Sequence, residues 1–239
     1  MKNILFVKQT HSTNALLWEL FREKQLPEGF VVQTDFQTAG KGQIGNSWES
    51  AYGKNLLFSM VLYPQQIPVD EMFIISQLIS LAIKKTLDDY TNDITIKWPN
   101  DIYWKDKKLG GILIENSLQG RKIKSVVIGI GLNINQKEFL SDAPNPVSLL
   151  QITGKRQNRK AILNSICEEI LGIYSNLDLQ KIRSQYVKSL YRNSGFHLFH
   201  TENDTFKAKI SSIHPDGQLE LETESGESRG FYFKEVQFQ

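Results

Sequence analysis

The sequence has a single cysteine among 239 residues, so the chain cannot form an internal disulfide. A lone thiol fits a reducing compartment, and Cys167 falls on the apolar face of a predicted helix, which indicates an inert core residue. Long apolar runs are missing too, because none approaches the ~20 residues that span a membrane. The first residues, MKNILFVKQ, are too short and polar for a signal peptide. The sequence therefore predicts a cytoplasmic protein with no membrane partner.

Excess charge of one sign and clustered histidines are also lacking. A formal net charge of +2 gives no general attraction to nucleic acid, so lysines and arginines must meet any anionic ligand locally. The chain has four histidines, and His197 and His200 would face opposite sides of a strand. No cysteine or third ligand accompanies them. A metal site at this pair is not expected.

The length suits one large domain followed by a small one. Apolar periodicity predicts helices that begin near Ser12, at Asp70 (as the N-cap), near Asn158 and at Leu179. Predicted strands alternate with them, and the last 45 or so residues contain short alternating strands between turn signals. We therefore expect residues 1–192 to form the main domain and residues 193–239 a small antiparallel barrel.

A glycine-rich segment, Thr34 to Trp48, joins two predicted strands. Gly40, Gly42 and Gly45 suit sharp bends or close approach to a ligand, and Lys41 adds a positive charge. Backbone N–H groups with one cation can hold a phosphate or carboxylate. The segment is neither a P-loop nor a dinucleotide fingerprint, since no helix follows. From these residues alone, an anion-binding loop and a mobile hairpin loop stay equally open.

Three further places carry polar groups next to glycine or a helix start. Lys108 precedes Gly110-Gly111, which are expected to open the strand Ile112 to Glu115, and its ammonium could face a site or solvent. Asn133 follows Gly129 and Gly131 in the apolar run Ser125 to Asn135, where it could cap a strand or contact a ligand. The segment Ser12-Thr13-Asn14 could cap its helix or present N–H and hydroxyl donors to a ligand.

Taken in order, these segments resemble one family. The chain contains STN at Ser12, the loop from Gln37 to Gly42 with Gly45 and Trp48, KWPND at Lys97, KLGGILIE at Lys108 and GIGLNIN at Gly129. This series closely resembles the biotin–protein ligases, also called holocarboxylase synthetases, over essentially the whole chain. The resemblance implies an α+β fold: a catalytic domain with a largely antiparallel sheet, like class II aminoacyl-tRNA synthetases, and a C-terminal SH3-like barrel.

The resemblance also implies a two-step reaction. Biotin's carboxylate attacks the α-phosphate of MgATP to give biotinyl-5′-AMP and pyrophosphate. A lysine of a biotin carboxyl carrier protein domain then takes the biotin and releases AMP. Some family members carry an N-terminal DNA-binding domain, and we expect none here because the first strand begins at Lys2. Pairing of two chains as a homodimer is a further possibility.

The family's functional residues map onto this sequence as three groups. Lys108 and Lys41 are expected to be catalytic, with Lys108 bridging the biotin carboxylate and the α-phosphate. The biotin site is expected to comprise Ser12, Thr13, Asn14, Gln37, Gly40, Lys41, Gly42, Lys108, Gly111, Gly129 and Gly131. The nucleotide site is expected to comprise Lys41, Gly42, Gln43, Trp48, Asn100, Lys108 and Asn133, with Asp101 as a ligand of Mg²⁺.

The glycine-rich loop departs from the family at Lys41, Gln43, Ile44 and Asn46, where many members have arginine. Lysine loses the bidentate grip of a guanidinium, so we expect weaker retention of the adenylate. Two rival functions are a lipoate or octanoate–protein ligase of the same fold and a non-catalytic binder that senses the adenylate. KWPND and the loop ending in Trp48 favour biotin over lipoate, and Lys108 favours catalysis over mere binding.

Overall fold

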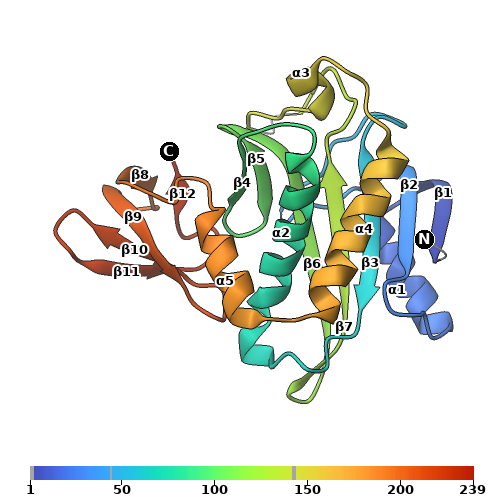
Figure 1. Ribbon diagram of the computed structural model, residues 1–239, viewed down its shortest axis with the longest axis horizontal. Coiled ribbons are helices and arrows are strands. Elements are labelled where there is room, and N and C mark those ends of the chain that lie inside the picture. Colours follow the sequence, from blue (N-terminus) through green and yellow to red (C-terminus); the bar gives the residue numbers. More distant parts are fainter. Residues whose placement is uncertain (1–2, 44, 142–143) are drawn as a thin grey trace.

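The computed structural model describes residues 3–43, 45–141 and 144–239, which form two β-sheets (Figure 1). In this described part, the larger sheet has the strand order β1-β2-β3-β7-β6-β5-β4. Its strands are β1 (Ile4–Thr10), β2 (Val31–Gln37), β3 (Leu56–Leu62), β4 (Ile94–Lys97), β5 (Asp101–Trp104), β6 (Lys107–Gln119) and β7 (Lys122–Leu132). The pair β1–β2 is parallel, and the pairs β2–β3, β3–β7, β7–β6, β6–β5 and β5–β4 are antiparallel. The largely antiparallel sheet is therefore confirmed.

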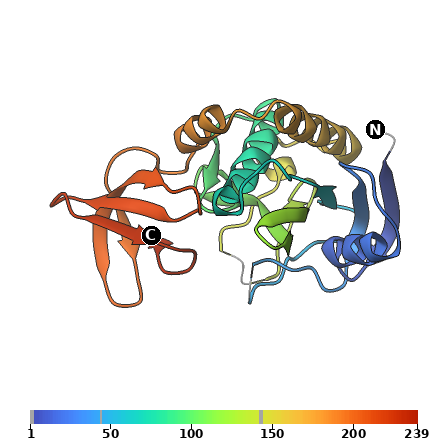
Figure 2. The same cartoon turned by 90° about the horizontal axis from the view of Figure 1, so that it is seen from below.

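Helices cover both faces of this sheet. They are α1 (Thr13–Glu23), the 3₁₀ turn η1 (Val69–Glu71), α2 (Phe73–Asp88), α3 (Leu149–Thr153), α4 (Arg159–Ser175) and α5 (Leu179–Lys188). Helices α2, α4 and α5 form one layer, and α1 lies on the opposite side (Figures 1 and 2). Throughout the residues described, no helix combines the length and the apolar character needed to cross a membrane.

The two faces of the sheet carry different side chains because strand residues alternate in direction. Met60 and Ile128 pack into the large core beneath α2 and α4. Their neighbours Val61 and Val127 pack with Leu17 of α1 in a separate, smaller core. Beyond this small core, the same face carries Ser59 on β3 and glycines on β7, which leaves room for the site described below.

The C-terminal sheet has the order β11-β10-β9-β8-β12, and all of its recorded pairs are antiparallel. Its strands are β8 (His197–His200), β9 (Thr205–Ile213), β10 (Leu219–Thr223), β11 (Ser228–Phe231) and β12 (Gln237–Phe238). Buried Phe199 and Leu219 belong to the same apolar core as α2 and α4. The indole Nε1 of Trp98 donates to the carbonyl of Gly217 at 3.0 Å. The α+β fold class is confirmed, while the boundary between residues 192 and 193 stays a prediction.

Several local expectations differ from the structure. Asp70 does not cap α2: it lies in η1, which closes through the Glu71 N–H to Pro68 O bond at 3.0 Å, and Met72 holds the N-cap position. Gly110 and Gly111 lie inside β6 instead of opening it, because β6 already pairs with β5 from Lys107. Helix α3 was not expected, whereas α5 begins at Leu179 as predicted and ends at Lys188.

Candidate active site

A cavity of about 1290 Å³ lies on the α1 face of the large sheet and is also lined by the C-terminal segment Val236 to Gln239. Most residues proposed from the sequence line this one cavity. They are Ser12, Thr13, Asn14, Gln37, Lys41, Gly42, Gln43, Trp48, Asn100, Asp101, Lys108, Gly111, Gly129, Gly131 and Asn133. Gly40 is not among the lining residues. It lies at the base of the loop, where a Cβ would come within 2.8 Å of the Trp48 carbonyl oxygen.

The glycine-rich loop folds back on itself as a tight extension between β2 and β3. The Trp48 N–H donates to Gly40 O at 3.0 Å, and the Gly42 N–H donates to Asn46 O at 2.9 Å. Lys41 and Ser47 form an isolated antiparallel bridge. Gly45 has φ of +86°, a conformation that L side chains rarely adopt. The expectation for Ile44 falls outside the described residues.

Glycines of β6 and β7 form the floor of the cavity, and Trp48 lies on it. Gly111 pairs directly with Gly131 in the antiparallel register, so both present the same bare surface. A Cβ at Gly131 would come within 2.6 Å of the Trp48 ring, and one at Gly111 within 3.3 Å. The absence of side chains at these two positions therefore lets the indole reach the sheet. Trp48 Nε1 is buried with no hydrogen-bond partner among the residues described.

The start of α1 is held by a buried polar network. The Gln37 Oε1 accepts from the N–H and hydroxyl of Thr13 at 2.8 and 3.1 Å. The Ser59 hydroxyl lies 2.7 Å from Thr13 Oγ1 and 2.6 Å from Asn14 Oδ1. The Asn14 amide donates to Glu115 at 2.8 Å. These bonds fix the orientation of polar groups at one end of the cavity.

One of the proposed contacts has a structural role and another lacks the one expected. Gly129 accommodates the Asn14 amide, because a Cβ there would lie 2.4 Å from Asn14 Oδ1. Ser12 occupies the N-cap position of α1, but its side chain makes no capping bond. Capping by the Ser12 side chain is therefore not observed. Its hydroxyl, at the cavity wall, has no recorded bond to another described residue.

Lys108 and Asp101 form an ion pair in the lining of the cavity, with Nζ 2.7 Å from Oδ1 and both side chains mostly buried. The Lys108 Nζ also lies 5.8 Å from the centre of the Trp48 ring. The Lys108 N–H donates to Asn145 O at 2.8 Å, and Val147 N–H donates to Lys108 O at 2.9 Å. Main-chain and side-chain contacts thus hold this ammonium over the glycine floor.

The residues proposed to bind the nucleotide differ in whether their side chains already form hydrogen bonds within the protein. The Asn100 amide donates to the carbonyl of Ile112, and Asn133 Oδ1 accepts from Asn55 at 3.4 Å. Gln43 Oε1, in contrast, is buried and has no partner within the described chain. Asn100 therefore joins the β4–β5 turn to β6, whereas Gln43 keeps an acceptor for another molecule.

Sequence reasoning missed a cationic and aromatic group at the junction with the C-terminal sheet. Lys97 Nζ lies 3.2 Å from the Tyr103 hydroxyl and 5.3 Å from the centre of the Phe238 ring. Burial lowers the pKa of Lys97, and Lys108 and Arg192 act in the same direction while Asp101 opposes them. Lys97 belongs to the KWPND motif, which could have drawn attention to it. The contact between Lys97 and Phe238 of β12 joins residues far apart in the sequence, so no local pattern predicts it.

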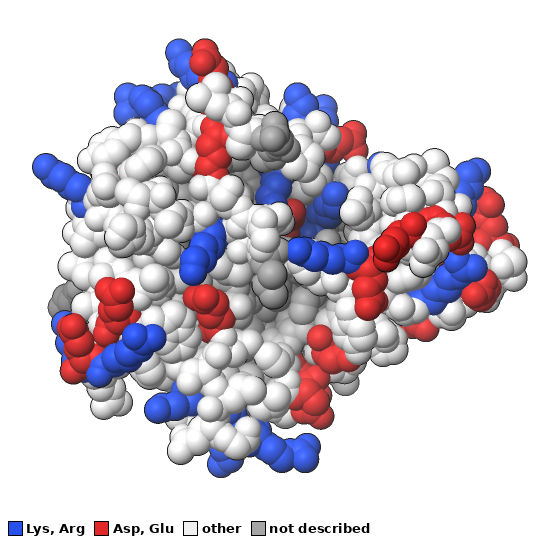
Figure 3. Space-filling view, turned by 180° about the vertical axis from the view of Figure 1, so that it is seen from behind, with Lys and Arg blue, Asp and Glu red and all other residues white. Residues whose placement is uncertain are grey.

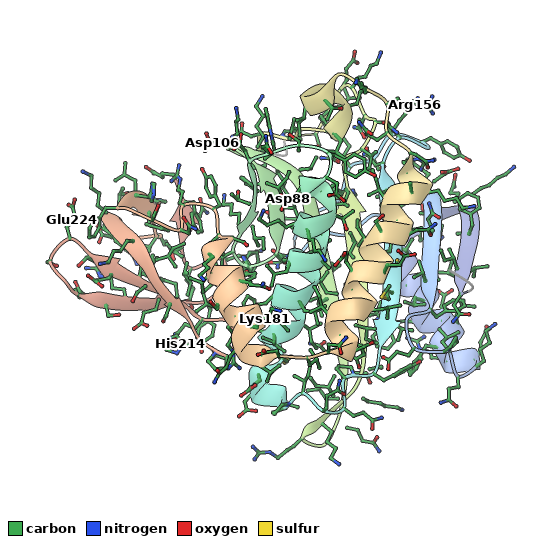
Figure 4. All side chains as sticks on the ribbon, viewed as in Figure 1. Asp88, Asp106, Arg156, Lys181, His214 and Glu224 are labelled. Carbon is green, nitrogen blue, oxygen red and sulfur yellow. The ribbon has the colours of Figure 1, made fainter. Side chains whose placement is uncertain are left out.

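Other parts of the C-terminal half also reach the cavity. The Tyr191 hydroxyl donates to Asp106 at 2.7 Å, at the turn between β5 and β6 that Figure 4 labels. A Cβ at Gly45 would lie 3.7 Å from Lys234 Nζ, so the glycine-rich loop approaches the second sheet. Figure 3 shows Lys and Arg side chains gathered around the hollow between the main body and the C-terminal sheet. The cavity therefore suits an anionic ligand although the whole chain is nearly neutral.

A protein-held magnesium site does not fit the donor set. Oδ1 of Asp101 is engaged by Lys108 Nζ. Within the described ranges, no group of three or more His, Cys, Asp or Glu side chains could hold a metal ion. Mg²⁺ usually binds one or two protein carboxylates together with substrate phosphates. Asp101 alone would leave most of the coordination to a substrate.

Comparisons with known proteins identify the family of the chain. Residues 6–133 match the biotin/lipoate A/B protein ligase family model. The bifunctional ligase/repressor BirA of Bacillus spizizenii is 31% identical over 235 residues, covering 94% of this chain and 71% of that protein. BirA of Bacillus subtilis is 32% identical over 210 residues, covering 84% of this chain and 63% of its own length.

The fold has a close counterpart among solved structures. The biotin protein ligase from Aquifex aeolicus, in complex with biotin and ATP, superposes with a TM-score of 0.80 at 24% identity. The match covers 100% of this chain and 99% of that one. At this identity the superposition supports the fold alone. The match to the family model and the similarity to the two Bacillus proteins support membership of the family. The chain belongs to the biotin/lipoate A/B protein ligase family.

Proposed function

We propose that this protein is a biotin–protein ligase that activates biotin with ATP and transfers it to a protein lysine. The observation that carries the proposal is the Lys108 ammonium, held within 2.7 Å of Asp101 in the glycine-floored cavity. Both reactants of the first step are anions, so a fixed cation at their meeting point lowers the cost of bringing them together. The named biotin–protein ligases among its relatives support the same conclusion.

In the first step the biotin carboxylate oxygen attacks the α-phosphorus of ATP, and the bond to pyrophosphate breaks. Lys108 stabilises the negative charge that develops on the phosphate oxygens. The α1 end of the cavity, with Ser12, Thr13 and Gln37, would bind the polar part of biotin. The C-terminal end, with Lys97 and Arg192, would face the nucleotide phosphates.

In the second step the ε-amine of a carrier lysine attacks the activated carbonyl of biotinyl-5′-AMP and AMP leaves. Water must be kept from this mixed anhydride until the lysine arrives. The loop Gly40 to Trp48, together with the indole on the glycine floor, would supply that cover. Mg²⁺ would enter with the phosphates of ATP, since the described lining of the cavity offers few carboxylates to hold it alone.

The partner is proposed to be a biotin carboxyl carrier protein domain of a biotin-dependent carboxylase. The action of the enzyme in the cytoplasm and the pairing of two chains stay predictions. Neither depends on the cavity described above.

The direct test measures ATP–pyrophosphate exchange with biotin, lipoate or octanoate as the only acid. We expect exchange with biotin alone. Exchange with lipoate or octanoate would favour the rival ligase of the same fold. A carrier domain incubated with biotin and MgATP should then gain the mass of one biotinyl group. A protein that binds biotinyl-5′-AMP but never labels the carrier would be a non-catalytic sensor instead.

A further inference from the structure

The residue that follows Trp48 makes a contact that the chemistry above does not use. Glu49 Oε1 accepts from the N–H of Leu140 at 2.9 Å, and Oε2 accepts from the N–H of Ser141 at 2.7 Å. The Gln136 side-chain amide donates to Oε1 at 3.0 Å. One carboxylate therefore binds two successive backbone N–H groups and a side-chain donor, an arrangement in which charge strengthens each bond.

The contact joins the glycine-rich loop to a second segment over the cavity. Gln136 is fixed in place, because its Oε1 accepts from Ala51 N–H at 2.9 Å and from Asn55 at 2.6 Å. Farther along the chain, Asn145 and Val147 bond the main chain of Lys108. Glu49 thus connects the exit of the glycine-rich loop to Leu140 and Ser141. In the sequence these two residues lie between Gln136, which is fixed, and Asn145, which bonds the Lys108 main chain.

The same contact lies where two cavities meet. Glu49, Leu140 and Ser141 line both the main cavity and a neighbouring cavity of about 630 Å³. Breaking the hydrogen bonds of Glu49 would therefore free the exit of the glycine-rich loop at the edge of the main cavity.

We propose that Glu49 is a positioning residue that locks the loop Gly40 to Trp48 to the segment Gln136 to Ser141 and thereby retains biotinyl-5′-AMP. This inference rests on the proposed ligase function. The lock acts through the two backbone segments and touches no reacting atom. It should therefore affect retention of the adenylate and the KM for ATP, and leave the binding of biotin at the α1 end nearly unchanged.

The test compares Glu49→Gln with wild type, and uses Glu138→Gln as a matched control. Glu138 is an exposed acid on the same segment, and no hydrogen bond or ion pair of its carboxylate is recorded with the described residues. The glutamine at 49 keeps the shape of the side chain but places an N–H₂ group against backbone donors. We expect biotinyl-5′-AMP to leave the preformed complex about tenfold faster in Glu49→Gln, in line with the strength of charge-assisted bonds. Glu138→Gln should match wild type.

Two further readouts separate a lock from a general structural role. Amide hydrogen exchange at Leu140 and Ser141 should quicken in Glu49→Gln without a change in the melting temperature. Glu49→Asp, which keeps the charge, should restore part of the retention. The KM for biotin should stay within about twofold of wild type, because the polar network around Thr13 does not include Glu49.

Each outcome decides one claim. An adenylate off-rate in Glu49→Gln equal to that of Glu138→Gln overturns the lock, and wild-type ATP–pyrophosphate exchange with biotin would then still stand. Faster loss together with a raised KM for biotin and a lowered melting temperature would also overturn it, since the defect would be general. Absence of exchange in the wild-type protein would overturn the ligase function itself, and the retention role would fall with it.

Discussion

Lys108 is held where the main chain and an acidic partner both restrict it, so its replacement should affect chemistry more than folding. We expect Lys108→Ala to lower the rate of adenylate formation by about 10²-fold or more, a typical loss for one preorganised charge-stabilising group. Pyrophosphate release with biotin and ATP measures it. Lys107→Ala is the matched control, because Lys107 is exposed and precedes Lys108 at the start of the same strand. Near wild-type release from Lys108→Ala would refute the assignment.

Gly129 should matter for stability instead of ligand contact. A Cβ there would meet Asn14 Oδ1 at 2.4 Å and disturb the network that includes Ser59. We expect Gly129→Ala to lower the free energy of unfolding by about 1–3 kcal/mol, as overpacking does. Urea denaturation measures the change.

Gly172 in α4 offers the contrasting substitution. Nothing lies within 4 Å of a Cβ built there. Gly172→Ala should therefore raise the free energy of unfolding by about 0.5–1 kcal/mol, the usual difference in helix propensity. Equal effects at the two positions would show that the Asn14 contact does not constrain Gly129.

At the scale of elements, helix α4 buries the single cysteine completely. Burial raises the pKa of the Cys167 thiol to about 12 from 9.0. Between these pH values the folded chain keeps a proton that the unfolded chain loses, so the free energy of unfolding falls as pH rises. The decline cannot exceed about 1.4 kcal/mol per pH unit.

Denaturation of wild type and Cys167→Ala between about pH 8 and about pH 11 checks this thiol contribution. The difference in unfolding free energy between the two proteins should change with pH in the expected direction. A constant difference would contradict it. Iodoacetamide should also label Cys167 only after unfolding, because the thiolate is the reactive form.

Some elements could be predicted because their signals are local. The apolar stripe of α2 and the apolar run of β7 are local signals, and both elements formed close to the expected segments. Strand β7 spans Lys122–Leu132, where the run Ser125 to Asn135 was expected. The N-cap of α2 was not predictable in this way, because Asp70 joined a 3₁₀ turn that the preceding proline-rich segment made possible. Short helix α3 begins with a capping box at Ser148 and Gln151, a local signal that is present in the sequence.

The site was partly predictable for the same reason. Gly111, Gly129 and Gly131 indicated close approach by some group. Which group approached each one depended on folding: Asn14 reached Gly129, and Trp48 reached the other two. Glu49 escaped notice because its partners Leu140 and Ser141 lie far away in the sequence. The contact of Lys97 with Phe238 is equally distant. The weaker adenylate retention expected from Gln43 stays a prediction.

At the scale of the whole molecule, the two sheets share one apolar core, in which Phe199 and Leu221 belong with the residues of α2 and α4. Removing residues 193–239 would expose that surface and take away the carbonyl that Trp98 binds. We expect the remaining fragment to melt about 10 °C or more below the full chain, since several kcal/mol of burial are lost. Circular dichroism measures the transition. A cooperative transition within a few degrees of the full chain would instead support the proposed boundary as one between independent domains.

The alternation of the central strands has a practical consequence for engineering a hardier enzyme. On β3 and β7 the even-numbered positions Met60 and Ile128 pack against the helical layer, while the odd-numbered Gly131 lines the cavity. Heat-resistant variants could therefore be sought by library mutagenesis at even positions with little expected loss of turnover. Altered vitamin preference would be sought at odd positions, one residue away along the same strand.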